Sequence, residues 1–157
     1  PEWRRVGTYT WDNTQRANPG WGWGGETRRI LARDAGTGAA LWEAETPVAP
    51  CSLAADTRNV VFHDGTKLVC LDLRTGGRRW ESAALSTPLP VHTNTGPRVL
   101  IHGEVVLAAP NTGRITAWSL ADGSKLWEQA QKPSGHMSLR DLFVVDGLVW
   151  TGAIANS

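Results

Sequence analysis

Apolar residues along the chain fall in short runs that alternate with polar turns rich in Gly, Asp, Asn and Thr. No stretch keeps an apolar residue at every third or fourth position, as an amphipathic helix would. Short runs separated by Asp-Gly and Thr-Gly turns are typical of strands in antiparallel hairpins. The pattern therefore predicts an all-β chain of short strands.

Four strands are predicted in succession between residues 47 and 83. The turn His63–Thr66 contains the Asp-Gly pair that suits a tight hairpin. The four strands are Cys51–Ala55, Val60–Phe62, Lys67–Asp72 and Arg79–Ala83. The same order recurs at Val99–Ile101, Val105–Ala109, Ile115–Leu120 and Lys125–Gln129, with a final pair at Leu142–Val145 and Leu148–Gly152 and an earlier strand at Arg29–Arg33. We therefore expect four-stranded antiparallel meanders.

One unit of sequence occurs three times: an apolar strand, a tight turn that ends in Gly, and a Trp-Glu pair. The copies run from Arg29 to Glu43, from Lys67 to Glu81 and from Arg114 to Glu128. The Trp-Glu tryptophans are 38 and then 47 residues apart, and the longer interval holds an inserted loop at His92–Pro97. Four short strands in a repeat of about 40 residues are the signature of a β-propeller blade.

Composition agrees with many turns and excludes some classes of function. The chain has 157 residues, including 17 Gly, 9 Pro and 9 Trp, and a formal charge of +1. The balanced charge gives no basic face for nucleic acid, and no apolar run approaches the roughly 18 residues of a transmembrane span. The chain begins with Pro1 and shows no signal peptide, so we expect it to be a piece of a longer protein.

The two cysteines and the first 25 residues are weakly informative. Cys51 and Cys70 are expected on strands two places apart in one sheet, about 9.6 Å from each other. A disulfide needs Cα atoms within about 7 Å, so two buried thiols are expected. The run Trp21–Gly25 could form a ligand platform, but an irregular strand and loop that closes onto a missing part of the molecule is favoured.

The three repeated units resemble the tryptophan-docking repeat of PQQ-like (quinoprotein-type) β-propellers. The usual form of that repeat is Ala-x-Asp-x-x-Thr-Gly-x-x-x-Trp. The copy that ends at Trp42 matches fully, the second has Cys70 for Ala, and the third has Ser119 for Asp and Asp122 for Thr. The resemblance covers about residues 26–152. It implies an all-β propeller of four-stranded antiparallel blades.

The resemblance also implies a structural role for the repeated residues. Each Trp is expected to stack on the Thr-Gly turn of a neighbouring blade, because Gly leaves room for a flat indole against the backbone. The Asp of the turn can accept backbone N–H bonds and so cap it. The residues concerned are Trp42, Trp80, Trp127, Gly38, Gly76, Gly123, Asp34 and Asp72.

A closed propeller of this family needs a longer chain, so we expect an open arc of about three and a half blades. Residues 1–25 would form an irregular or partial blade, and residues 26–46 the end of the first blade. Residues 47–85 would form the second blade, residues 86–130 the third, and residues 131–157 the start of a fourth.

No set of residues predicts a catalytic, cofactor or metal site. A PQQ-dependent dehydrogenase of this family would need a Ca²⁺ held by Glu, Asn and Asp, an Asp base, and often two adjacent cysteines. The four histidines lack zinc-ligand spacing, and His63 and His102 are expected to be exposed turn residues. Ser134 and His136 suggest a hydrolase, but no nucleophile elbow accompanies them.

Two classes of function stay open. The first is a non-catalytic propeller that binds another protein, similar to the outer-membrane assembly lipoproteins of this superfamily, which implies a periplasmic or other extracytoplasmic location. The second is part of a PQQ-dependent dehydrogenase, or a propeller joined to a catalytic domain outside this chain. The missing metal and cysteine motifs favour the first class. Its expected partner is a protein, or the missing blades of the same protein, with no nucleic acid and no membrane span.

Overall fold

The computed structural model of the chain describes residues 22–87, 89, 91–92, 96–110, 112–131 and 142–151. Every regular element in this part of the chain is a β-strand, and every strand pairs with antiparallel neighbours. The strands form two four-stranded sheets and three two-stranded ones. Within these residues, no helix with the length and apolar character to cross a membrane is present.

The strands follow one another in each sheet in the order of the sequence. The first hairpin is β2 (Thr27–Arg33) with β3 (Ala40–Pro47). One full sheet holds β4 (Ala54–Ala55), β5 (Asn59–His63), β6 (Leu68–Asp72) and β7 (Arg78–Glu81). The next holds β9 (Arg98–His102), β10 (Val105–Ala109), β11 (Arg114–Ser119) and β12 (Lys125–Ala130). The last hairpin is β13 (Leu142–Val145) with β14 (Leu148–Thr151), and a small sheet joins β1 (Gly22–Trp23) to β8 (Val91–His92).

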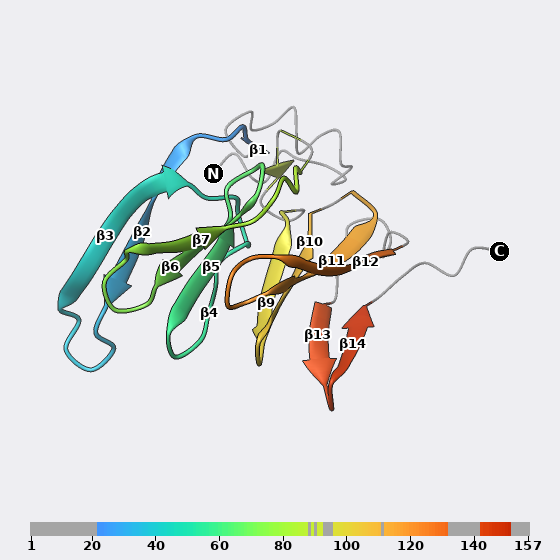
Figure 1. Cartoon of the computed structure of the whole chain (residues 1–157). Coiled ribbons are helices and arrows are strands. Elements are labelled where there is room, and N and C mark those ends of the chain that lie inside the picture. The colour runs from blue at the N-terminus through green and yellow to red at the C-terminus, as the bar shows by residue number, and fades with distance from the viewer. Residues whose placement is uncertain are drawn as a thin grey trace, which may run out of the picture.

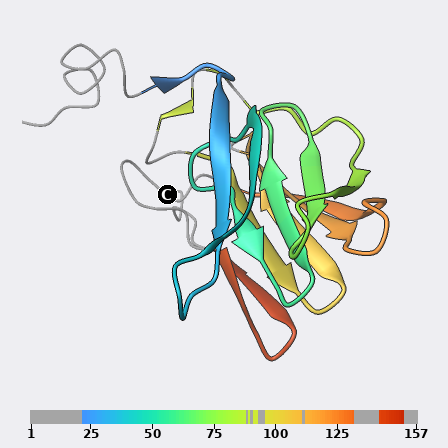
Figure 2. The same ribbon diagram turned by 90° about the vertical axis from the view of Figure 1, so that its left-hand side faces the viewer.

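The sheets stand side by side as the blades of a propeller. Figure 1 shows the hairpin β2–β3, the sheet β4–β7, the sheet β9–β12 and the hairpin β13–β14 in succession from left to right. Strand β9 contacts both β4 and β13, so the first strands of successive blades share the inner side of the arc. Figure 2 views the arc from the side of β2 and β3. The prediction of an all-β propeller arc with four-stranded antiparallel blades is confirmed.

Apolar cores fill the spaces between successive sheets. Side chains alternate between the two faces of a strand, so each central sheet needs apolar residues on both faces. All five residues of β5 are accordingly buried. Ile30 of β2 packs against Val60, Phe62, Val69 and Leu71 of the first full sheet. The opposite face of that sheet packs against the next one through Val61, Leu68, Cys70, Trp80, Val106, Ala108, Trp118 and Leu120.

Expectations about two single residues, Cys51 and His63, are corrected by the structure. Cys51 is exposed in a turn with a φ of 62°, a left-handed conformation that no strand contains, so the strand expected at Cys51–Ala55 shortens to β4. Only Cys70 is the buried thiol that was expected. His63 is fully buried instead of exposed, because backbone groups satisfy its ring nitrogens. His102 is exposed, as expected.

The end of the Trp-rich segment belongs to the core. Trp23 is fully buried and packs with Ala49 and Val91. Its Nε1 donates a hydrogen bond to the carbonyl oxygen of Glu26 at 2.8 Å. The ligand platform considered for Trp21–Gly25 is therefore not formed by Trp23, whereas Trp21 lies outside the described residues. The boundaries expected for the individual blades stay a prediction.

Candidate functional site: the contacts between tryptophans and turns

In two of the three repeated units, one aspartate builds the turn between the last two strands of the blade. In the turn of β2–β3, the Oδ1 of Asp34 accepts hydrogen bonds from the backbone N–H of Gly36 at 3.0 Å and of Thr37 at 2.8 Å, and from the Thr37 hydroxyl. In the turn of β6–β7, Asp72 accepts the same three bonds from the residues at the same positions, Arg74 and Thr75. The carboxylates thus bind backbone donors that the turn would otherwise leave without partners.

These hydrogen bonds favour the charged form of the two carboxyl groups. The hydroxyl and the N–H of Thr37 lower the pKa of Asp34 below its ordinary value. The pKa of Asp72 is lowered much further, first by the Arg79 guanidinium and then by Thr75. Both aspartates are therefore anions at neutral pH that are engaged within their own turns.

The third turn keeps the backbone path with different side chains. The N–H of the turn Gly donates to the carbonyl four residues earlier in all three copies, at 2.8 Å in Gly38, 2.9 Å in Gly76 and 2.9 Å in Gly123. Ser119 replaces the capping Asp here, and Asp122 instead accepts bonds from the N–H and hydroxyl of Ser124. The departure from the repeat that was noted in the sequence therefore leaves the turn unchanged.

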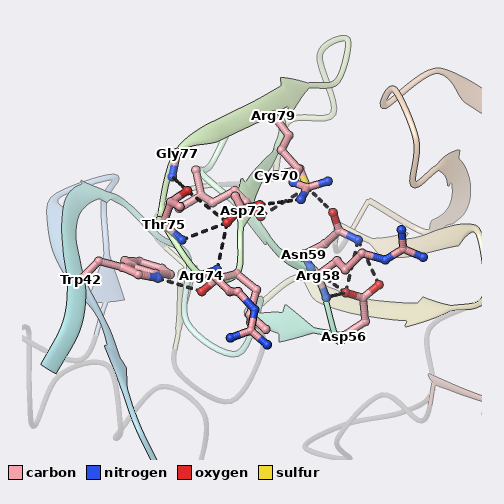
Figure 3. Close-up of polar contacts among 12 residues, drawn as sticks. Trp42, Asp56, Arg58, Asn59, Cys70, Asp72, Arg74, Thr75, Gly77 and Arg79 are labelled. Carbon is pink, nitrogen blue, oxygen red and sulfur yellow. Dashed lines mark hydrogen bonds and ion pairs between the residues drawn. The ribbon is translucent and has the colours of Figure 1, made fainter. Parts of the chain in front are cut away.

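Trp42 lies against the turn of the following sheet. Its Nε1 donates a hydrogen bond to the carbonyl oxygen of Leu73 at 2.8 Å, a contact drawn in Figure 3. A Cβ added to Gly76 would come within 2.8 Å of the indole ring, so only Gly permits this approach. The φ of Gly76 is also 70°, in the left-handed region that favours Gly.

Trp80 makes the same contacts one blade further along. Its Nε1 donates to the carbonyl oxygen of Leu120 at 2.8 Å, and a Cβ on Gly123 would lie 2.5 Å from the ring. Trp80 is 8% exposed and belongs to the core between the two full sheets. The structure thus brings together Trp42 with Gly76 and Trp80 with Gly123.

The remaining Trp and the remaining turn are not brought together. Trp127 is 37% exposed, on the side of β12 that faces β14. A Cβ on Gly38 would meet no described atom within 4 Å, although the φ of Gly38 is 73° as in the other two turns. Each contact links a Trp to the turn of the next blade, so these two positions lie at opposite ends of the arc.

Ion pairs that sequence reasoning missed accompany every copy of the repeat. The Glu that follows each Trp pairs across the hairpin with the basic residue at the start of the same unit: Arg29 with Glu43, Lys67 with Glu81, and Arg114 with Glu128. The signal was present in the sequence, because every unit begins with Arg or Lys and ends with Glu. Every side chain in these pairs keeps at least 29% of its surface exposed to solvent, so we expect each pair to contribute less than about 1 kcal/mol.

The other titratable groups do not converge on a common site. Among the described residues, no group of three or more His, Cys, Asp or Glu side chains is placed to hold a metal ion. Burial raises the pKa of the Cys70 thiol to about 11, which keeps it protonated and a poor nucleophile at neutral pH. Burial likewise lowers the pKa of His63. Ser134 and His136 lie outside the described residues.

Comparison with solved structures gives the fold a wider context. BamB from Moraxella catarrhalis superposes with a TM-score of 0.64 at 22% identity, over 82% of this chain and 44% of that one. The computationally designed Ika8 protein superposes with a TM-score of 0.58 at 20% identity, over 84% of this chain and 38% of that one. A europium-containing methanol dehydrogenase superposes with a TM-score of 0.53 at 17% identity, over 67% of this chain and 22% of that one. At these identities the likeness shows the fold alone, and the chain spans less than half the length of each.

A search of curated protein sequences found no match. The family model described as "Outer membrane protein assembly factor BamB" matches residues 23–149, which is most of the chain and includes all three repeated units. The match agrees with the repeat, with the turns that build it and with the propeller arrangement of the sheets. The chain therefore belongs to this family of PQQ-like propellers.

Proposed function

We propose that the chain is a non-catalytic propeller segment that binds another protein during assembly of the cell envelope, outside the cytoplasm. The observation that carries the proposal is the match of residues 23–149 to the outer membrane assembly factor family. The use of charged residues supports it. The acidic residues of the repeat are engaged in turn caps and cross-strand ion pairs, which leaves them in structural roles.

In this proposal the residues of the repeat hold the binding surface in shape. Trp42 and Trp80 dock on neighbouring turns through a hydrogen bond and close packing on Gly, and Asp34 and Asp72 keep two of the turns in form. The proposal extends this structural role to the full set of repeated residues: Trp42, Trp80, Trp127, Gly38, Gly76, Gly123, Asp34 and Asp72. Rigid scaffolds of this kind present loops and outer strands to partners.

Site-specific photo-crosslinking tests the binding role. Leu41 on β3 and Leu126 on β12 are more than half exposed at equivalent positions of two blades. The variant chain, with a photoreactive residue at either position, is secreted to the periplasm. There it should form a crosslink to a protein of the outer-membrane assembly machinery. The same variants retained in the cytoplasm are the control and should not trap it. Identical products from both compartments would contradict the proposal.

A second candidate is a segment of a PQQ-dependent dehydrogenase, which the structural likeness to methanol dehydrogenase favours. Titration with PQQ and Ca²⁺, followed by tryptophan fluorescence, separates the two functions because nine tryptophans make quenching easy to detect. The scaffold proposal expects no saturable quenching. Saturation at micromolar PQQ that a Ca²⁺ chelator reverses would favour the dehydrogenase alternative, because the resemblance to PQQ-dependent dehydrogenases implies a Ca²⁺ at such a site.

A further inference from the structure

The two ends of the arc are complementary halves of one blade. The hairpin β13–β14 corresponds to the first two strands of a blade, as β9–β10 does. Both hairpins have a two-residue connection, and β13 contacts β9 on the inner side of the arc. The hairpin β2–β3 has the turn and the Trp of the last two strands, as β6–β7 does. Among the described residues, β14 pairs only with β13 and β2 only with β3.

The last hairpin carries an apolar face that complete blades bury. Phe143, Val145, Leu148 and Trp150 share this face, and the rings of Phe143 and Trp150 stack with centroids 6.4 Å apart. In the equivalent hairpin β9–β10, Leu107 stands at the position of Trp150. Leu107 is 2% exposed, whereas Trp150 is 50% exposed. An adjoining blade is what covers this face in the rest of the arc.

At the opposite end of the arc, an apolar hollow matches the apolar character of the last hairpin. A hollow of about 320 Å³ lies beside β2, where the first two strands of its blade would stand. Its apolar lining includes Ile30, Leu31, Val48, Ala49 and Leu53. Leu31 and Leu53 are each about half exposed. An apolar hairpin that paired with β2 would fill this hollow and extend the sheet by antiparallel strand addition.

The empty turn and the exposed Trp match each other as well. The Gly38 turn has the backbone hydrogen bond and left-handed φ of the two turns that receive a Trp. The Ala35 carbonyl stands at the position of the Leu73 and Leu120 carbonyls that accept the indole N–H. Trp127 borders a second hollow, of about 350 Å³, where a following turn would lie. Donor and acceptor of one further contact are therefore both present in the chain.

We infer that two copies of this chain associate head to tail: β13–β14 of one copy pairs with β2–β3 of the other to complete a four-stranded blade, and Trp127 docks on the Gly38 turn. The contact joins different surfaces of the two copies, so it can repeat, and a ring forms if the rotation closes. The chain aligns with 44% of the Moraxella catarrhalis propeller, so two copies supply most of such a ring. This inference is independent of the proposed function.

Two substitutions remove the two sides of the contact. Trp127→Ala deletes the docking indole. Gly38→Ala adds a methyl group that meets none of the described atoms within 4 Å, but that would lie about as close to a docked ring as the 2.8 Å and 2.5 Å found at Gly76 and Gly123. Gly103→Ala is the matched control, because Gly103 also has a positive φ and open space but lies in another turn. Circular dichroism confirms folding of each variant.

Sedimentation velocity over a range of concentrations provides the test. The wild-type chain and Gly103→Ala should form dimers or larger species, while Trp127→Ala and Gly38→Ala should each weaken association at least tenfold. An equimolar mixture of the two weak variants should recover dimers, because Trp127 of one then meets Gly38 of the other. A monomeric wild type, which would mean that another segment fills these positions, overturns the inference. Association that both substitutions leave unchanged, or a mixture of folded variants that fails to recover dimers, overturns it equally.

Discussion

At the scale of single residues, the buried histidine couples folding to pH. His63 has no exposed surface, and its Nδ1 accepts a hydrogen bond from the backbone N–H of Gly65 at 2.9 Å. The proton must therefore sit on Nε2, which contacts the carbonyl oxygen of Leu85. A second proton would remove the acceptor for Gly65 and place a charge in the core. The neutral ring is the form that the fold requires.

The lowered pKa of His63 predicts a loss of stability in mild acid. The unfolded chain has the ordinary pKa of about 6.5, and burial lowers the pKa in the folded state. The contribution of neutral His63 to the free energy of unfolding is fully present above about pH 6.5. It falls as the pH drops below this value toward the pKa of the folded state, by at most about 1.4 kcal/mol per pH unit. Urea denaturation at pH 7.5 and 5 should show this loss.

The control for this prediction is His63→Gln, whose amide can accept from Gly65 and donate to Leu85 without titrating. This variant should lose less stability than the wild type between the two pH values, whatever its stability at pH 7.5. Equal losses in both proteins would assign the pH dependence to other groups.

At the scale of elements, the contact between a Trp and the next turn is the repeated link of the arc. Trp80 adds a hydrogen bond to Leu120 to its packing in the core between the two full sheets. Trp80→Ala should lower the free energy of unfolding by about 3–5 kcal/mol, as for other buried aromatic residues. Chemical denaturation at low protein concentration, where the chain is monomeric, measures the change.

Trp127→Ala is the matched control, because the same residue type stands at the same position of the next blade but is 37% exposed. Under the same conditions it should lower the free energy of unfolding clearly less than Trp80→Ala does. If the two substitutions cost the same, docking on a turn is not what makes Trp80 important.

The sequence predicts the strands and turns well because their signals are local. Asp-Gly and Thr-Gly pairs mark turns such as His63–Thr66, and the apolar runs between them mark strands within one or two residues. The small sheet of β1 and β8 was not predicted, since it joins two-residue strands almost 70 positions apart in the sequence. Cys51 was misassigned for a related reason: an apolar residue in a turn looks like the first residue of a strand.

The sequence predicts less about the contacts within the candidate site. It gives the Trp and Gly of each repeat and the Asp of the first two, but not which copy faces which, because that depends on the order of the blades in space. It also gives no sign that His63 is buried, because the backbone of Leu85 and Gly65 that satisfies the ring comes from the chain path, not from a side-chain pattern. The ion pair between Lys67 and Glu81 could have been read from the repeat.

At the scale of the whole molecule, burial declines from the middle of the arc to its ends. In β5 every residue is buried and in β6 only the last is not, whereas no residue of β13 or β14 is buried. The hairpin β2–β3 has one buried residue, Ile30. In repeat architectures each unit is stabilised mainly by its neighbours. The central sheets have two neighbours and the end hairpins have one.

Hydrogen exchange should reveal this gradient, because amides in poorly buried units exchange by local opening at a lower cost than global unfolding. In dilute protein, amides of β5, β6 and β10 should be the most protected, and those of β2–β3 and β13–β14 should exchange faster. Raising the protein concentration should then slow exchange in the two end hairpins together, since head-to-tail association covers both at once, and should leave the central strands unchanged. Trp127→Ala is the control in which this concentration dependence should disappear. Uniform protection along the arc would contradict the neighbour argument, and protection that rises at only one end would contradict the pairing of the two hairpins.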